Sequence, residues 1–138
     1  MSDTIDLEIV TPERKLLSVK ASEVEVPGVV GYFGVLPGHA PFLTSLGIGE
    51  LSYKDATGTH FFAAADGFVE VLPNRVTILA RLCEPAREID VERAREAKRR
   101  AEESMKQTAK LSDQDMLMAE LSLKRALTRL MVAGRTRT

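Results

Sequence analysis

The sequence has few features of disulfide-bonded, secreted or membrane-spanning proteins. Cys83 is the single cysteine among 138 residues, so no disulfide can form within the chain, and its apolar neighbours predict burial as a small hydrophobic side chain. No apolar run approaches the roughly 20 residues that a membrane-spanning helix needs. The first residues are acidic where a signal peptide would be basic. We therefore expect a protein that is made in the cytoplasm and stays on that side of the membrane.

Motifs for nucleotide chemistry, metal binding and hydrolysis are also missing. The glycine cluster of residues 28–38 is not followed by Gly-Lys-Ser/Thr and does not open a helix, so neither nucleotide-binding fingerprint is met. His39 and His60 lack cysteine partners and helical spacing, which leaves a zinc site without enough ligands and favours structural or solvent-facing roles. No Gly-x-Ser-x-Gly elbow is present. We therefore name no catalytic residue and no metal ligand, and nothing in these motifs argues for hydrolysis, although an enzyme stays open at this point.

The two halves of the chain differ in charge. Residues 1–86 carry 6 basic and 11 acidic side chains, whereas residues 87–138 carry 13 basic and 9 acidic ones. The second half has a net charge of only +4 and no aromatic residue to stack on bases, so nucleic acid is not an expected partner. We predict two domains, residues 1–86 and residues 87–138.

The first half has the pattern of an antiparallel β-sandwich or barrel. Apolar residues recur at every second position, which places one face of each segment in a core. Turn signals such as Pro37-Gly38, Asp66-Gly67 and Pro73-Asn74 separate these runs at short intervals. The alternating apolar sets are Ile5, Leu7 and Ile9; Val24 and Val26; Phe61, Ala63 and Ala65; and Val76, Ile78 and Ala80.

The second half is predicted to be helical. No glycine or proline occurs between Pro85 and Gly134, and strong helix formers dominate. Asp90 is a candidate N-cap of a first helix, and Ser112 is a candidate N-cap of a second, with the break near residues 108–112. Gly134 stands where a C-terminal glycine cap belongs.

The two predicted helices form an antiparallel hairpin with a narrow apolar seam. The first helix offers mostly alanines, so its contact with the second is weak compared with a full core, and we expect the hairpin to move. The seam candidates are Val91, Ala94, Ala97, Ala101 and Met105 on the first helix, and Met116, Ala119, Leu123, Ala126, Leu127 and Leu130 on the second.

Four arginines of the second half are spaced to meet on a folded hairpin. They are Arg93 and Arg100, seven residues apart on the first helix, and Arg125 and Arg129, four apart on the second. Converging guanidinium groups suit a polyphosphate, which they grip through paired hydrogen bonds. The alternative is a solvated helix face, which spacing alone favours. Its ion pairs would be Glu92–Arg95 and Glu96–Arg100.

Two longer stretches resemble a known family. Residues 26–44 (VPGVVGYFGVLPGHAPFLT) and residues 67–80 (GFVEVLPNRVTILA) resemble signatures of the epsilon subunit of bacterial F-type ATP synthases. Residues 7–12 and 119–130 are also similar to that family, so the likeness covers nearly the whole chain. Two positions depart from the family pattern: Tyr32 stands where relatives commonly carry an acidic or polar residue facing the c ring, and Asp66 stands where glycine is frequent.

The resemblance implies a fold, a function and partners. The fold would be a β-sandwich of about ten strands, docked on the gamma subunit and the c ring, followed by an α-helical hairpin. In the family, the extended hairpin reaches toward the alpha and beta subunits and blocks ATP hydrolysis, and the subunit itself is not catalytic and needs no cofactor. The protein would be a rotor component at the cytoplasmic face of the bacterial inner membrane, held there only through the complex. The rotor-docking residues would include Gly31, Tyr32, Phe33, Gly34 and His39.

Some members of the family bind ATP as a regulatory ligand on the folded hairpin. Their Ile/Leu-Asp-x-x-Arg-Ala motif is matched by residues 89–94. A free-standing nucleotide-sensing binding protein with the same fold is the alternative that the residues leave open. The ATP contacts that the resemblance implies are Glu84, Ile89, Asp90, Arg93, Ala94, Arg100, Arg125 and Arg129.

Overall fold

The structure is a computed structural model that describes residues 3–107 and 112–135. Contacts between Cα atoms divide the chain into two compact units, Met1–Pro85 and Ala86–Thr138, which are described separately. Neither helix of the described ranges is long and apolar enough to cross a lipid bilayer.

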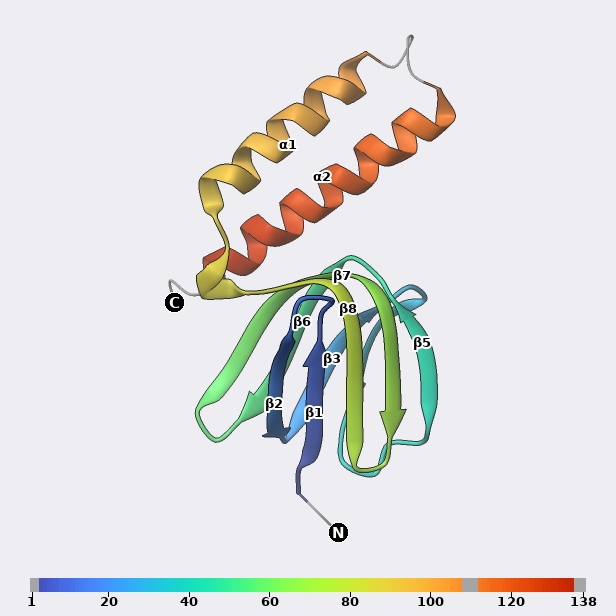
Figure 1. Cartoon of the computed structure of the whole chain (residues 1–138), viewed down its shortest axis with the longest axis vertical. Helices are drawn as coiled ribbons and strands as arrows, with labels where there is room; N and C mark the ends of the chain where they lie inside the picture. Colours follow the sequence, from blue (N-terminus) through green and yellow to red (C-terminus); the bar gives the residue numbers. More distant parts are fainter. Residues whose placement is uncertain (1–2, 108–111, 136–138) are drawn as a thin grey trace. The chain divides into compact units, whose positions relative to one another are not determined.

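The first unit is a β-sandwich whose strands form one hydrogen-bonded network (Figure 1). The strand order is β2-β1-β8-β7-β5-β3-β4, and β6 pairs with both β3 and β7. The pair β1 and β8 is parallel, and the other pairs among the described residues are antiparallel. The strands are β1 (Ile5–Val10), β2 (Lys15–Ala21), β3 (Glu23–Gly28), β4 (Gly31–Val35), β5 (Phe42–Leu46), β6 (Gly49–Asp55), β7 (Gly58–Leu72) and β8 (Arg75–Pro85).

One long strand, β7, serves both layers of the sandwich. Residues 58–64 pair with β6, whereas residues 67–71 pair with β5. The prediction that Asp66-Gly67 separates two strands was therefore wrong, because these residues lie inside β7, where the pairing passes from one neighbour to the other. The described residues form 8 strands where about ten were expected, since β7 and β8 each run unbroken past this point.

The core of the sandwich confirms most of the alternation read from the sequence. The predicted inward residues of β1, β3 and β8 are buried, and their intervening neighbours are more exposed. In β7 the prediction was wrong: Phe62 and Ala64 belong to the core cluster, whereas the predicted Phe61 is only partly buried and the predicted Ala63 and Ala65 are buried outside that cluster. The fully buried side chains include Ile5, Leu7, Ile9, Val24, Val26, Val69, Val71, Val76 and Ile78.

The second unit contains a short 3₁₀ helix, η1 (Ala86–Glu88), and the helices α1 (Val91–Lys106) and α2 (Asp113–Gly134). Both predicted N-caps are confirmed: the backbone N–H of Arg93 donates to the Asp90 carboxylate at 3.0 Å, and that of Asp115 donates to the Ser112 hydroxyl at 3.1 Å. The predicted break between the helices falls largely on residues 108–111, outside the described residues. The predicted role of Gly134 was wrong, because it is the last residue of α2 and not a left-handed cap.

The seam of the hairpin is built from small side chains. Ala94 and Ala101 of α1 and Ala119 and Ala126 of α2 are buried, as predicted. Leu127 is 46% exposed and does not belong to the buried set. Burying one methyl group contributes about 0.8 kcal/mol, less than the roughly 1.5–3 kcal/mol of a whole leucine side chain. A seam of alanines therefore holds the two helices weakly.

Candidate functional site

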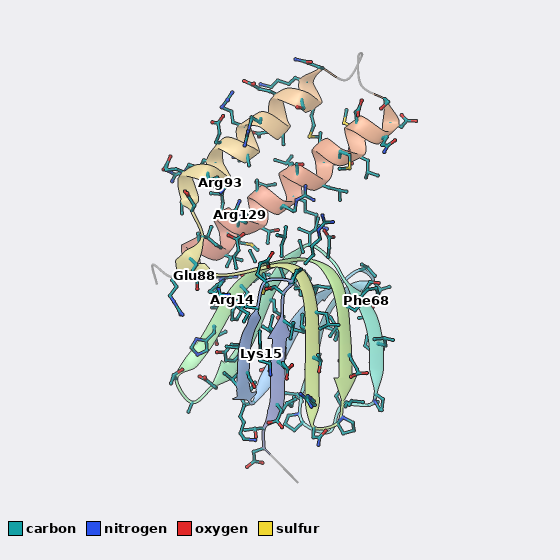
Figure 2. All side chains as sticks on the ribbon, viewed as in Figure 1. Arg14, Lys15, Phe68, Glu88, Arg93 and Arg129 are labelled. Carbon is teal, nitrogen blue, oxygen red and sulfur yellow. The ribbon has the colours of Figure 1, made fainter. Side chains whose placement is uncertain are left out.

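Three of the four candidate arginines border the seam of the hairpin. Arg93, Arg100 and Arg125 each precede a buried alanine, so their side chains leave the helices beside the line of contact. Figure 2 shows Arg93 near the first turn of α1 and Arg129 near the last turns of α2. Arg93 and Arg100 are exposed, whereas Arg125 and Arg129 are partly buried. The hairpin thus carries guanidinium groups on both of its helices.

The arginines of α1 fall into two groups by their charge partners. Arg95 is ion-paired with Glu92, and Arg99 is paired with Glu96 and Glu103. The Arg99 guanidinium lowers the pKa of Glu96, and its carboxylate neighbours raise the pKa of Arg99. The predicted pair Glu92–Arg95 is confirmed, whereas Glu96 pairs with Arg99 and not with the predicted Arg100.

Arg93 and Arg100 lie outside this network of ion pairs. Within residues 3–107 and 112–135, no carboxylate lies within ion-pair distance of either guanidinium. Arg95 and Arg99 therefore belong to a solvated helix face with salt bridges. Arg93 and Arg100, two of the predicted ATP contacts, do not. The charge of Arg100 also lowers the pKa of Glu96, so Arg93 is the cationic side chain that remains most available to an anionic ligand.

The other residues of the 89–94 motif have structural roles. Ile89 and Ala94 are buried, and Asp90 caps α1. On α2, the guanidinium of Arg125 donates a hydrogen bond to the Ser122 hydroxyl at 3.1 Å. Glu84 belongs to β8 in the first unit, while the other predicted ATP contacts belong to the second. The ATP site remains a prediction, and Arg93 is its most accessible motif residue.

A groove of about 460 Å³ lies between α1 and α2. Its floor is made of alanines, because their short side chains leave space between the helices. Among the predicted arginines, Arg100 alone contributes to its lining, and Asp115 supplies an opposite charge. The lining residues are Ala97, Arg100, Ala101, Ser104, Asp115, Met118, Ala119 and Ser122.

The predicted rotor-docking residues lie on β4 and in the loop that follows it. The Tyr32 side chain is 58% exposed, yet its hydroxyl accepts a hydrogen bond from the Glu50 backbone N–H at 2.9 Å. Phe33 is partly buried and meets Phe42 edge to face at 5.4 Å. The His39 ring donates to the Ala40 carbonyl at 2.6 Å. Gly31 and Gly34 are exposed positions of β4.

Sequence reasoning missed an exposed apolar patch on the outer face of the sandwich. Leu43, Phe68 and Leu79 are 69%, 58% and 50% exposed. Phe68 (labelled in Figure 2) pairs with Leu79 on one side and with Ser45 on the other, and Leu43 is two residues from Ser45, so the three apolar side chains share one face. Phe68 and Leu79 occupy outward positions beside the buried residues Val69 and Ile78. The sequence therefore contained a sign of this patch, because apolar residues occupy strand positions where the alternating pattern calls for polar ones.

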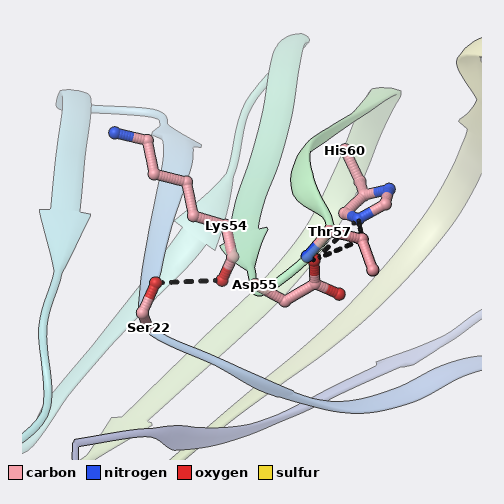
Figure 3. A network of polar contacts seen from close by, with 5 residues as sticks. All are labelled: Ser22, Lys54, Asp55, Thr57 and His60. Atoms are coloured by element: carbon pink, nitrogen blue, oxygen red, sulfur yellow. Dashed lines mark hydrogen bonds and ion pairs between the residues drawn. The ribbon is translucent and has the colours of Figure 1, made fainter.

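The turn between β6 and β7 is closed by a polar network (Figure 3). Asp55 Oδ1 accepts hydrogen bonds from the Thr57 hydroxyl at 2.6 Å and the Thr57 backbone N–H at 2.8 Å, and it lies 3.1 Å from His60 Nε2. The Thr57 hydroxyl and His60 together hold the pKa of Asp55 at about 2. The His60 ring stacks on Tyr53, with ring centroids 4.7 Å apart. This confirms the structural role expected of His60.

Cys83 is partly buried, so the expected burial is confirmed only in part. It packs against the sandwich core, and burial raises the pKa of its thiol to about 12. The thiol therefore stays protonated near neutral pH and is a poor nucleophile.

Two family models match the chain over residues 4–134. The first, described as "ATP synthase, Delta/Epsilon chain, beta-sandwich domain", matches residues 4–86, and the second, "ATP synthase, Delta/Epsilon chain, long alpha-helix domain", matches residues 87–134. An ATP synthase epsilon chain of Geotalea daltonii is 46% identical over 136 residues, which cover 99% of this chain and 98% of the relative. An epsilon chain of Koribacter versatilis is 51% identical over 105 residues, covering 76% of this chain and 74% of the relative.

Solved structures share the fold. A chain in the cryo-EM structure of the Euglena gracilis mitochondrial ATP synthase, comprising OSCP, F1 and the c-ring, superposes with a TM-score of 0.82 at 20% identity, covering 98% of this chain and 83% of that one. A chain of the Tetrahymena thermophila mitochondrial ATP synthase central stalk and c-ring gives a TM-score of 0.56 at 15% identity, covering 97% and 96%. At these identities the likeness concerns the fold alone.

Proposed function

The chain belongs to the delta/epsilon chain family of ATP synthases, and from this premise we propose that it works as the epsilon-type central-stalk subunit of a bacterial F-type ATP synthase. It couples the catalytic head to the c ring during proton-driven ATP synthesis and catalyses no reaction itself. Its partners are the gamma subunit and the c ring, with the alpha and beta subunits as further partners of an extended hairpin. It is held at the cytoplasmic face of the inner membrane only through this complex.

The exposed apolar patch of Leu43, Phe68 and Leu79 is the observation that carries the docking role. Exposed apolar side chains on neighbouring strands lower the free energy when a partner covers them. The strands beneath the patch are hydrogen-bonded to neighbours on both sides, so the surface is rigid before a partner arrives. A preorganised apolar surface loses little entropy on binding. We assign this patch to the gamma subunit and the region of Gly31–Gly34 and His39 to the c ring.

The helical hairpin is the regulatory part of the proposal. Because the seam consists of alanines, the free-energy difference between the compact and the opened hairpin is small. A small difference suits an element that changes between two conformations. In the described residues Arg93 and Arg100 form no ion pair, and Arg100 acts on the Glu96 carboxylate only through its charge, so both can receive the phosphates of ATP. ATP that binds only the compact hairpin would favour it by about 2.7 kcal/mol at a hundredfold excess over Kd. High ATP would then relieve the inhibition of hydrolysis.

A substitution in the patch tests the docking role. Phe68→Asp places a charge in the centre of the patch, and we expect it to weaken binding to the gamma subunit by about 2 kcal/mol, or roughly thirtyfold in Kd. Thr59→Asp is the matched control, because Thr59 is exposed on the same strand outside the patch.

Co-purification with the gamma subunit is the measurement. Wild type and Thr59→Asp are expected to co-purify with the gamma subunit, and Phe68→Asp is expected to purify without it. A wild-type chain that also runs alone would overturn the proposal and favour a free-standing nucleotide-sensing protein. Equal retention of all three chains would move the docking surface elsewhere on the sandwich.

A further inference from the structure

The groove between α1 and α2 places a methionine beside hydrogen-bond donors of the facing helix. Met118 of α2 lines this groove together with Arg100 and Ser104 of α1. A thioether sulfur is only a weak hydrogen-bond acceptor, whereas a guanidinium group and a hydroxyl are good donors. In its reduced form, Met118 therefore makes little use of the polar groups on α1.

The guanidinium of Arg100 is not committed to a carboxylate. It forms no ion pair within the ranges 3–107 and 112–135. Its charge lowers the pKa of Glu96, but that carboxylate forms its hydrogen bonds with Arg99. A new acceptor on α2 would thus meet a cationic donor on α1, and a hydrogen bond from a charged group is stronger than one between neutral groups.

The described methionines differ in how readily an oxidant reaches them. Met118 is 54% exposed and Met131 is 48% exposed, whereas Met105 and Met116 are partly buried. A peroxide must touch the sulfur to react with it, so the two exposed methionines are the better targets. Of these two, Met118 lines the groove and Met131 does not. Oxidation of Met118 therefore creates its product beside the donors of α1.

We propose that Met118 is a site of oxidation by peroxides and that its sulfoxide holds the hairpin closed. One oxygen atom passes from hydrogen peroxide to the Met118 sulfur. The peroxide O–O bond breaks and an S–O bond forms, while the sulfur loses two electrons and the peroxide is reduced to water. The sulfoxide oxygen is a strong acceptor, and in the groove it receives a hydrogen bond from Arg100, with Ser104 as a second donor.

The exposure of Met118 decides the sign of the effect. A sulfoxide in a sealed apolar core is unfavourable, because its oxygen loses water without gaining a partner. Met118 is half exposed, so its oxygen loses little hydration and gains the bond to Arg100. The alanine seam holds the helices weakly, and one charge-assisted hydrogen bond across it is a large addition. If the chain has the proposed function, oxidation would then keep the hairpin from inhibiting ATP hydrolysis.

Hydrogen exchange of the full-length chain measures the effect. Samples are treated with hydrogen peroxide, peptide mass spectrometry locates the added oxygen, and exchange of the α1 and α2 amides is followed before and after treatment. Met118 is expected to oxidise severalfold faster than Met105 and Met116. Oxidation is expected to slow amide exchange in both helices about tenfold, because opening of the hairpin must first break the new hydrogen bond.

Three variants separate the proposed contact from other effects of oxidation. Met118→Leu stays apolar but forms no sulfoxide, so peroxide is expected to leave its amide exchange unchanged. Met131→Leu is the matched control and is expected to keep the slowing seen in wild type. Arg100→Ala removes the cationic donor and is expected to lose most of the slowing. Circular dichroism confirms that each variant retains its helices.

Four results would overturn the proposal. Oxidation of Met118 no faster than that of Met105 and Met116 would remove the preferred site. Unchanged exchange after oxidation would exclude a new contact, and faster exchange would mean that the sulfoxide opens the hairpin. Slowing that persists in Met118→Leu would place the effect on another methionine. Because the isolated chain is measured, none of these results bears on the proposed docking role.

Discussion

Asp66 and Gly67 occupy the point where β7 passes from β6 to β5. Asp66 has φ 60°, which for a residue with a Cβ lies in the left-handed region. Gly67 has φ 143°, and a Cβ there would overlap the Leu79 carbonyl oxygen on the neighbouring strand. Backbone crowding thus requires glycine at residue 67, whereas Asp66 is tolerated because a short polar side chain adopts this conformation at modest cost.

Replacing Gly67 tests this account of the bend. Gly67→Ala is expected to destabilise the chain by about 3 kcal/mol, because both the positive φ and the backbone overlap oppose a side chain. Gly34→Ala is the control, since nothing lies within 4 Å of a Cβ built there. Urea denaturation of the two variants measures the difference, and equal stabilities would contradict the account.

The carboxylate of Asp55 gives the β6–β7 turn a pH dependence. Its pKa falls from 3.8 to about 2, chiefly through the Thr57 hydroxyl and then His60. A carboxyl with a depressed folded-state pKa contributes stability that is fully present above its unfolded pKa and is lost as pH falls through the folded value. We expect the wild-type Tm to fall more steeply than that of Asp55→Asn between about pH 4 and pH 2. Parallel curves in thermal melts would show that the network does not stabilise the turn.

Helix α1 presents two kinds of arginine on one short element. Arg95 and Arg99 are paired with glutamates three or four residues away, which is the pattern of a solvated helix face. Arg93 and Arg100 stand beside the alanine seam and form no ion pair among the described residues, although the charge of Arg100 also lowers the pKa of Glu96. The same helix can therefore keep one charged face toward water and offer two cations to a ligand.

A pair of alanine variants separates these roles. Arg93→Ala is expected to weaken ATP binding about tenfold or more, because a charge-assisted hydrogen bond to phosphate is lost. Arg95→Ala, two residues away but ion-paired to Glu92, is expected to leave the affinity within about twofold. Calorimetric titration of the full chain with ATP measures both. If Arg93→Ala binds as tightly as wild type, the predicted ATP site is wrong.

The sequence predicted the elements better than their details, for identifiable physical reasons. Period two and period 3.6 are strong signals, so the core of β1 and both helix caps were predictable. Asp66-Gly67 was misread because a chain-reversing turn and a bend inside a strand need the same left-handed backbone. Glu96 was given the wrong partner because spacings of three and four residues both allow an ion pair. Leu127 was wrongly assigned to the seam, because the side of a helix that faces its partner changes along the length of the contact.

The site was less predictable than the fold. The 89–94 motif identified Arg93, but the structural roles of Ile89 and Ala94 appear only once burial is known. The patch of Phe68 and Leu79 needs the strand register, because these residues are 11 apart in sequence and become neighbours only when β7 and β8 pair. The resemblance to the family was enough to predict a docking role. The exposed surface proposed for that role could be identified only from the three-dimensional structure.

The two units divide the proposed work of the molecule. The sandwich has a large aliphatic core and a rigid outer surface, as expected of a docking module. The hairpin has a thin alanine seam, a groove and, in the described residues, two arginines that form no ion pair, as expected of a switch. Docking should therefore depend on the first unit and inhibition on the second.

Reconstitution of the ATP synthase with either the full chain or residues 1–86 alone tests this division most directly. The account predicts that both chains bind the complex and that only the full chain lowers its rate of ATP hydrolysis. If the sandwich alone inhibits hydrolysis as strongly as the full chain, or if neither chain binds, the central claim is contradicted.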